Sequence, residues 1–325
     1  MRIAITGATG FIGRYVMHGM LAGGHEVRAL CRPGRESALD VPQGRDVEVH
    51  TGDLADAASL KGFLAGADYL IHLASCHDHF SDEEMQRINV YGTTALIDEA
   101  KANAPSGFQF VIVSSAVIGV PVYSYYRDSK RVQEKVVRGS GLPWASFRPT
   151  LVYGRGDFRH TAPLLRKCGA RRGIYWVFHE GVSKINPVHV EDLVDAIARF
   201  FDYERAKDVD CVYEIAGPEG IPFNDFIDVT IRAAGGGVKR RNIPRRWVER
   251  AIFVKGLFTD VTRERRGAGY FSLHHDHNIT AAVTELGWRP RHYRDGIVEI
   301  ARDDWWRAEP GEPLRRAAGE RDGKP

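Results

Sequence analysis

A glycine-rich turn begins at residue 7, between a short apolar run and a segment with helical periodicity. Residues 2–6 (RIAIT) have the composition of a buried strand, and residues 11–22 alternate like an amphipathic helix. Glycines between them permit a tight turn, let backbone amides approach a pyrophosphate, and let the helix pack against the strand. The pattern predicts a strand–turn–helix unit that binds a dinucleotide. The expected contacts are Gly7, Thr9, Gly10, Phe11, Ile12 and Gly13.

Further apolar runs alternate with helix-like segments, which predicts a Rossmann-type, doubly wound parallel sheet in an α/β fold. We expect strands at residues 25–31, 47–51, 69–73 and 110–114, and helices at 93–102, 128–138, 190–201 and 224–234. Two later strands are expected in ASFRP and YEIAGP. The predicted domains are a dinucleotide-binding domain at 1–145, a smaller substrate-binding lobe at 146–310 with segments that return to the sheet, and a disordered tail at 311–325.

Composition excludes several other classes of protein. With 325 residues, 43% of them hydrophobic, and a net charge of +3, the chain is typical of a globular protein rather than a disordered or coiled-coil one. No apolar run is long enough for a membrane span, and the first residues lack a signal peptide, so we expect a cytoplasmic protein. Its four cysteines form no CxxC pair, which predicts neither a metal site nor a disulfide framework.

The residues that follow the second expected strand indicate which nicotinamide cofactor is bound. Arg32 and Arg35 stand where an acidic residue would select NAD, and guanidinium groups suit a 2′-phosphate. We therefore expect NADP as the preferred cofactor, with NAD possible. Further cofactor contacts are expected after the third and fourth strands: Asp53 and Leu54, then Leu73, Ala74 and Ser75.

A candidate catalytic set follows the strand at 110–114. Ser115 stands at the strand end, and Tyr126 precedes Lys130 by four residues, a spacing that puts both on one helix face. A nearby ammonium stabilises the ionised phenol, which makes Tyr126 a general acid or base, and Ser115 would hold the substrate oxygen. Tyr203 and Lys207 have the same spacing, but no serine or strand end precedes them.

Together the strings TGATGFIG, IHLAS, NVYGTTALIDEA, VSS and YRDSK resemble the extended branch of the short-chain dehydrogenase/reductase superfamily, the NAD-dependent epimerase/dehydratase family. The resemblance extends to about residue 305. It implies that Ser115 donates to the substrate oxygen, that Tyr126 transfers the proton, and that Lys130 bridges the ribose hydroxyls of the cofactor. It also implies a structural role for Asn89. Nicotinamide contacts are implied for Pro149, Leu151 and Val152.

Two departures from the family pattern narrow the reaction. Ala116 and Val117 replace the Asp-Glu pair of dehydratases, so elimination lacks its acid and base. The segment between Ser115 and Tyr126 is shorter than in sugar-nucleotide epimerases, and is similar to atypical members related to an accessory subunit of respiratory complex I. We expect an oxidoreductase acting on a ketone or a nucleotide-linked sugar. The alternatives are an epimerase that retains its cofactor and a non-catalytic scaffold that binds the cofactor; a homodimer is possible.

Other polar clusters carry weaker expectations. Residues 274–277 (HHDH) are spaced too tightly for one helix face, so no metal is expected there, and residues 77–79 would line the pocket. We expect His189 to be a packed residue. Arg240, Arg241 and Arg245 suit an anionic small-molecule substrate, a nucleotide sugar or one linked to CoA, better than a nucleic acid, because aromatic residues are sparse around them.

Overall fold

The computed structural model describes residues 1–77, 80–178, 180–203, 210–262, 273 and 276–308. The predicted tail at 311–325 lies outside these residues, as do residues 78, 79, 274 and 275 of the histidine clusters. The chain divides into two compact units. The first contains Met1–Thr150, Val190–Ala216 and His277–Arg289; the second contains Leu151–His189, Gly217–Asp276 and Pro290–Pro325. This division differs from the expected boundary at 145/146, because one continuous strand spans that position.

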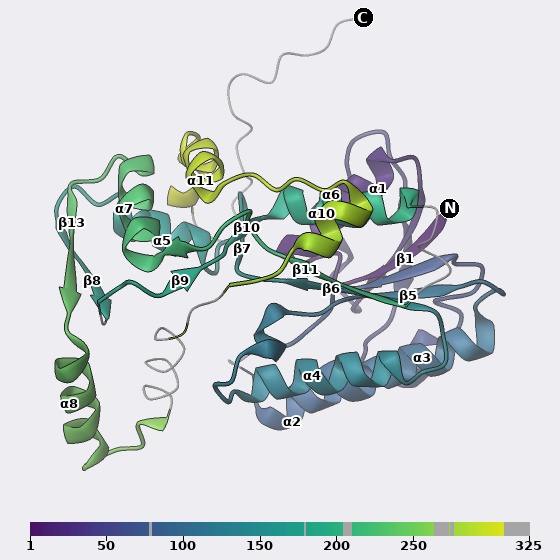
Figure 1. Cartoon of the computed structure of the whole chain (residues 1–325). Helices are drawn as coiled ribbons and strands as arrows, with labels where there is room; N and C mark the ends of the chain where they lie inside the picture. Colours follow the sequence, from purple (N-terminus) through teal and green to yellow (C-terminus); the bar gives the residue numbers. More distant parts are fainter. Residues whose placement is uncertain (78–79, 179, 204–209, 263–272, 274–275, 309–325) are drawn as a thin grey trace, which may run out of the picture. The chain divides into compact units, whose positions relative to one another are not determined.

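A seven-stranded sheet, parallel throughout, forms the centre of the first unit (Figure 1). Its order is β11-β6-β5-β4-β1-β2-β3, so the strand order reverses beside β1, where doubly wound sheets bind their ligands. The expected Rossmann-type fold is confirmed. The strands are β1 (Arg2–Thr6), β2 (Glu26–Cys31), β3 (Glu48–Thr51), β4 (Tyr69–His72), β5 (Gln109–Val113), β6 (Trp144–Pro149) and β11 (Cys211–Ile215).

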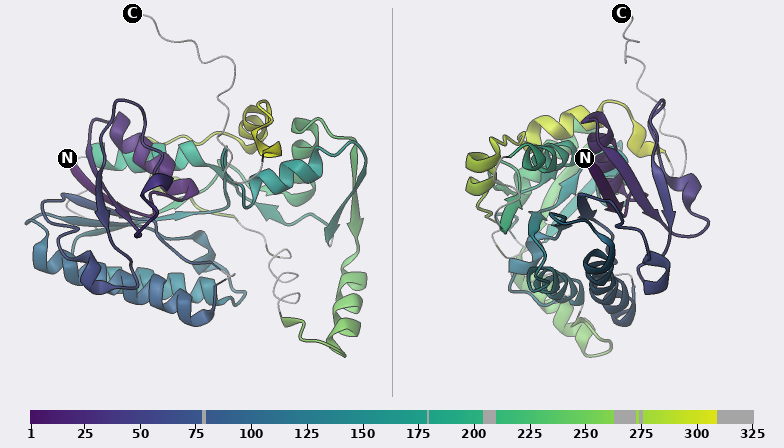
Figure 2. Two further views of the ribbon diagram at one scale, coloured as in Figure 1. Left: turned by 180° about the vertical axis from the view of Figure 1, so that it is seen from behind. Right: turned by 90° about the vertical axis from the view of Figure 1, so that its right-hand side faces the viewer.

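Helices cover both faces of this sheet. Figure 2 shows α3 and α4 on one face and α1 and α6 on the other, and α1 packs against α6. The α-helices of this unit are α1 (Phe11–Ala22), α2 (Asp82–Met85), α3 (Gly92–Asn103), α4 (Tyr125–Arg138), α6 (Val190–Asp202) and α10 (Thr280–Leu286). Its 3₁₀ helices are η1 (Glu36–Ala38), η2 (Ala57–Leu60) and η4 (Ala116–Gly119), and η3 (Gln86–Tyr91) is a π-helix.

Burial on both faces explains why the central strands are continuous apolar runs. Every residue of β5 (QFVIV) is buried, as expected for a parallel strand with helices on each side. One core cluster joins β5 to helices α3 and α4 through Phe110, Leu96 and Val137. The sheet is therefore a rigid platform whose carboxyl edge carries the residues of interest.

Among its described residues, the second unit contains three two-stranded sheets and a group of helices. β7 (Val152–Tyr153) pairs with β10 (Val188–His189), β9 (Lys184–Ile185) with β12 (Ile221–Pro222), and β8 (Gly173–Phe178) with β13 (Val238–Ile243). The helices are α5 (Thr161–Cys168), α7 (Phe223–Ala233), α8 (Arg245–Gly256), α11 (Tyr293–Ala301) and the 3₁₀ helix η5 (Trp305–Arg307). A separate core, which includes Phe226, Tyr293 and Trp305, holds this unit together. Within the described residues, no helix is long and apolar enough to cross a membrane.

Candidate active site

The glycine turn joins β1 to α1 and leaves no room for a side chain at Gly7 or Gly13. Gly7 has φ +78°, and a Cβ there would lie 2.8 Å from the Ala74 nitrogen. A Cβ on Gly13 would lie 2.0 Å from the Gly7 carbonyl oxygen. Gly10 is the N-cap of α1, which has neither a side-chain cap nor an acidic residue in its first turn. The positive end of the helix and its backbone amides therefore fit the phosphates of a dinucleotide.

The segment after β2 presents two cations to solvent. Arg32 and Arg35 are exposed, and within the described residues neither has an ion-pair partner. The Arg35 amide donates to the Arg32 carbonyl oxygen, which closes a turn that includes Gly34 at φ +73°. Two guanidinium groups are thus available beside the carboxyl end of β2.

The ends of β3 and β4 hold the other expected cofactor contacts. Asp53 Oδ1 accepts a hydrogen bond from the Ala55 amide at 2.9 Å, and Leu54 is buried. Ala74 donates its amide to Thr6 Oγ1 at 3.2 Å, which ties the end of β4 to the end of β1. Thr9, Phe11, Ile12, Leu73 and Ser75 are at least partly exposed around the same strand ends.

Helix α4 begins early enough to include Tyr126. Ser124 caps its first turn by accepting from the Arg127 amide at 3.1 Å, so the helix starts three residues before the position expected from periodicity. The segment before it is tied to the helix, since Arg127 Nη1 donates to the Val120 carbonyl at 3.0 Å and Arg131 Nη2 to the Ile118 carbonyl. The short segment between Ser115 and Tyr126 is therefore held against α4.

Lys130 joins this helix to the sheet. Its Nζ donates to the Val113 carbonyl oxygen at 3.1 Å, two residues before Ser115, and its side chain is 1% exposed. Ser115 is the N-cap of η4 and accepts from the Val117 amide at 3.3 Å. Lys130 thus contacts the carboxyl end of β5, Ser115 follows two residues later, and Tyr126 lies one turn before Lys130 on α4.

Burial changes the chemistry of Lys130. Desolvation lowers the pKa of its amine from 10.5 to about 7, and the nearby Glu134 carboxylate opposes the shift. Its second partner is Gln133 Oε1 at 2.5 Å, so the amine contacts one carbonyl and one amide oxygen. The Lys130 amine, which was expected to be an ammonium, therefore carries only part of its positive charge above neutral pH.

A buried polar network behind Lys130 was not predicted from the sequence. Gln133 Nε2 lies 3.0 Å from His72 Nε2 and 2.9 Å from Thr93 Oγ1, and His72 Nδ1 lies 2.7 Å from Thr6 Oγ1. Burial, helped by the charge of Lys130, lowers the pKa of His72 to about 3, so this imidazole is neutral. The signal was weak: Gln133 stands three residues after Lys130, and this spacing alone does not identify it as a partner of the lysine.

Two further contacts orient the catalytic candidates. The His77 ring stacks on the Tyr126 ring, with the ring centroids 4.7 Å apart and an angle of 27° between the ring planes. His77, which was expected to line the pocket, therefore lies beside the phenol of Tyr126. Asn89 accepts from the Cys76 amide at 2.7 Å and donates to Ser129 Oγ at 3.0 Å. It connects the segment that carries His77 to helix α4.

Glu134 is a second buried ionic group on α4. It accepts from Ser146 Oγ at 2.9 Å and from the Arg148 guanidinium through both oxygens. Burial would raise the pKa of Glu134, but its hydrogen bonds and the Arg148 charge outweigh this and leave the pKa lowered. The pair ties α4 to β6, and Pro149 ends that strand in the first unit.

The remaining candidates belong mostly to the second unit, which includes Leu151 and Val152. His189 is 2% exposed and makes an edge-to-face contact with Tyr153, so it is a packed residue, as predicted.

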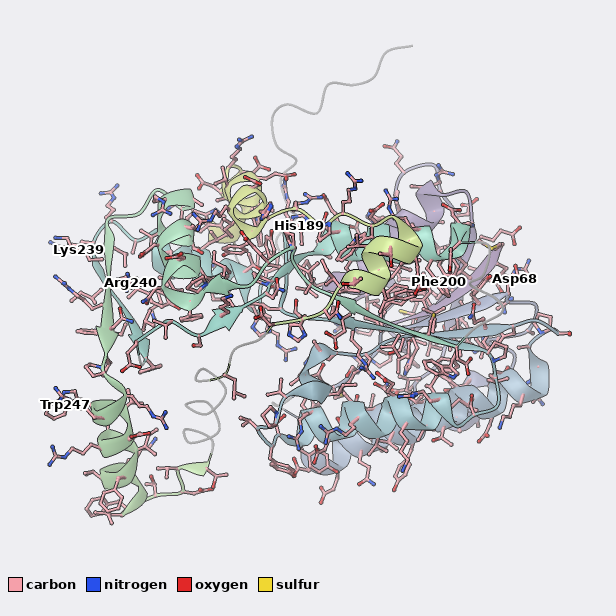
Figure 3. The ribbon with its side chains drawn as sticks, in the orientation of Figure 1. Asp68, His189, Phe200, Lys239, Arg240 and Trp247 are labelled. Atoms are coloured by element: carbon pink, nitrogen blue, oxygen red, sulfur yellow. The ribbon has the colours of Figure 1, made fainter. Side chains whose placement is uncertain are left out.

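Two of the basic residues that were expected to suit an anionic substrate form ion pairs. Arg240 makes a two-point ion pair with Asp228 on α7, and Arg245 pairs with Glu249. Figure 3 shows Arg240 turned toward α7.

The histidine cluster at 274–277 is described only in part. His277 Nδ1 lies 3.2 Å from Glu214 Oε2 within the first unit, where it joins β11 to the segment before α10. Over the described part of the chain, no group of His, Cys, Asp and Glu side chains has the arrangement of a metal site.

Residues 3–216 match the NAD dependent epimerase/dehydratase family, a span that includes the glycine turn, Ser115, Tyr126 and Lys130. The chain belongs to that family. It is therefore an enzyme of the short-chain dehydrogenase/reductase superfamily, in the class of NAD(P)-dependent oxidoreductases and epimerases. Membership confirms the resemblance inferred from the motifs.

Named members of the family differ in reaction. The chain is 33% identical to a ceramide reductase of Caulobacter vibrioides over 198 residues, which are 61% of this chain and 60% of that relative. It is 27% identical to a (4-alkanoyl-5-oxo-2,5-dihydrofuran-3-yl)methyl phosphate reductase of Streptomyces griseus over 309 residues, 92% and 98% of the two chains. UDP-glucose 4-epimerase of Bifidobacterium longum, solved with NAD+ and UDP, shares the fold: TM-score 0.71, 18% identity, and 93% and 97% of the two chains covered.

Proposed function

We propose that this member of the epimerase/dehydratase family is an NADP-dependent reductase of ketones. The observation that carries the proposal is the arrangement at the carboxyl end of β5. Lys130 Nζ donates to the Val113 carbonyl, Ser115 follows on the same segment, and Tyr126 lies one helical turn from Lys130. This set joins a proton donor, a hydrogen-bond donor for a carbonyl oxygen and a basic group in the unit that carries the glycine turn.

In the proposed reaction, Ser115 Oγ donates to the ketone oxygen and holds it beside the Tyr126 hydroxyl. When bound, the reduced nicotinamide supplies the hydride that the carbonyl carbon accepts. Tyr126 transfers its phenolic proton to the oxygen as negative charge develops there, which yields the alcohol. Lys130, whose ammonium is oriented by Val113 and Gln133, stabilises the phenolate that Tyr126 becomes.

The 2′-phosphate of NADP is assigned to Arg32 and Arg35. Both side chains are exposed beside the end of β2, and no acidic residue stands at the end of that strand. Arg32→Asp should raise the Michaelis constant for NADPH at least tenfold more than that for NADH. Arg45→Asp, also at an exposed arginine of the first unit, is the matched control. Equal changes for the two cofactors would contradict the NADP assignment.

The proposed substrate class is supported by the two relatives described above that are named as reductases. Ceramide and an alkanoyl furanone phosphate both carry alkyl chains, so we propose a ketone that bears an alkyl chain. Reduction predicts stoichiometric loss of NADPH absorbance with such ketones. An epimerase that retains its cofactor would instead convert a nucleotide sugar with no net change in that absorbance.

Tyr126→Phe separates the reductase from a non-catalytic scaffold. Removal of the phenolic proton should lower kcat by about 10²–10⁴-fold, the range of general acid catalysis, while NADPH affinity stays unchanged. Tyr125→Phe is the matched control and should retain activity. The hydroxyl of this neighbouring tyrosine donates a hydrogen bond to Gln86 Oε1 at 3.4 Å. Full activity in Tyr126→Phe would refute the proposed role. Loss of activity in both variants would indicate damage to α4 instead.

A further inference from the structure

Helix α8 in the second unit packs against very little of the described chain. None of its twelve residues is buried. Trp247, Ala251 and Val254 recur at helical spacing on one exposed face, and both Trp247 and Val254 are 52% exposed. Just past the helix, Phe258 is 82% exposed. A helix with a large apolar face and no covering partner gains its stability by burying that face on something else.

The strand pair before α8 presents a second exposed apolar face. On β8 the outward residues are Ile174, Trp176 and Phe178, each about half exposed, while Val177 between them is buried. Since β8 and β13 are parallel and in register, Lys239 stands beside Ile174 and Arg241 beside Trp176. The outer face of this sheet therefore combines large apolar side chains with basic ones.

Charge on this surface is mostly positive. Arg240 pairs with Asp228 on the other side, and the rest of residues 238–258 contain six basic side chains and one acidic side chain, a net charge of +5. The acidic one, Glu249, pairs with Arg245. Figure 3 shows Lys239 and Trp247 projecting from the same side of β13 and α8, opposite to Arg240. Basic groups such as Lys239 and Arg241 thus flank the apolar side chains of this face.

We propose that the outer face of β8, β13 and α8 binds the surface of an anionic lipid bilayer. Tryptophan and phenylalanine side chains enter the boundary between headgroups and acyl chains, while the flanking lysines and arginines contact lipid phosphates. A second copy of the chain fits the face less well, because a symmetric contact would place two positively charged surfaces against each other. The face lies in the second unit, so the proposal does not depend on the assignment of Tyr126 or Arg32.

Flotation with vesicles tests this proposal on the full chain. We compare phosphatidylcholine vesicles with vesicles in which part of the lipid is phosphatidylglycerol, at low and high salt. Wild-type protein should float with the anionic vesicles, and high salt should weaken that binding. Lys239→Glu with Arg241→Glu should reduce the binding constant at least about 30-fold, from about 1 kcal/mol for each basic group.

An apolar variant tests the other half of the surface. Trp176→Ser with Trp247→Ser should reduce vesicle binding about tenfold or more, because both indole rings leave the interface. Matched controls in the first unit are Arg45→Glu with Lys61→Glu for charge, and Tyr91→Ser for an exposed aromatic. Circular dichroism and thermal melting confirm that every variant is folded.

Three results would overturn the proposal. They are equal flotation with neutral and anionic vesicles, no flotation with either, and equal loss of binding in the surface variants and their controls. A dimer in analytical ultracentrifugation that the tryptophan variant dissociates, without vesicle binding by the wild type, would assign the face to a second copy instead. None of these measurements uses substrate, so a failed reductase assay leaves their outcome intact.

Discussion

Replacing Lys130 with methionine tests whether a buried amine loses its proton near neutral pH. The side chain is 1% exposed, and burial lowers its pKa from 10.5 to about 7. In the unfolded chain the amine holds its proton up to about pH 10, while the folded chain releases it above about pH 7. Between these values the unfolded state binds more protons, so this residue makes the free energy of unfolding rise with pH.

The size of the effect follows from proton linkage. One proton of difference changes the free energy of unfolding by about 1.4 kcal/mol per pH unit. From about pH 7.5 to pH 8.5 the folded amine is mostly neutral and the unfolded amine mostly charged. Lys130 should therefore contribute a rise of about 1 kcal/mol across that interval. Lys130→Met removes this contribution, whatever its effect on overall stability.

Urea unfolding at several pH values measures the slope for wild type, Lys130→Met and Lys135→Met. Lys135 lies on the same helix but is exposed, so its variant controls for the loss of a lysine from α4. The difference between wild type and Lys130→Met should grow by about 1 kcal/mol from pH 7.5 to pH 8.5, while Lys135→Met follows the wild type. A flat difference would refute the reasoning, because the amine would then stay charged in the folded protein.

Three further predictions follow from the site. The kcat/KM for ketone reduction should fall as pH rises above about 7, because the lowered pKa of Lys130 removes the charge that stabilises the Tyr126 phenolate; a pH profile that stays level through pH 9 would contradict this. Gly13→Ala should destabilise the fold by about 3 kcal/mol, since its Cβ meets the turn backbone, whereas Gly119→Ala, with open space around it, should change the melting temperature little. Glu134→Gln should lower the free energy of unfolding by about 2 kcal/mol, as measured by urea titration, because Arg148 loses its carboxylate partner. The difference from wild type should shrink at low pH, where the Glu134 carboxylate of the wild type is itself protonated.

The fold could be predicted from the sequence because its signals are local. The glycine turn needs only residues 7–13, and the buried strands are continuous apolar runs such as QFVIV, which specify their own burial on both faces. The family motifs are local too, and the four-residue spacing of Tyr126 and Lys130 is a property of any helix. The expected start of α4 at residue 128 was three residues too late, because Ser124 is the N-cap of the helix and periodicity alone does not show a cap.

Tertiary structure decided the environment of those residues. The neutral His72 and the Gln133 amide that orients Lys130 come from positions 61 residues apart, and no sequence spacing brings them together. Likewise, the basic residues of β13 were visible in the sequence, but the apolar side chains beside them come from β8 through strand pairing. Sequence alone determined which chemical groups are present and how the groups that are close in the chain are spaced along a helix or strand. Long-range packing decided which of them are dehydrated, and dehydration sets the charge of the buried Lys130. The same packing leaves the apolar side chains of β8 and α8 exposed among the described residues.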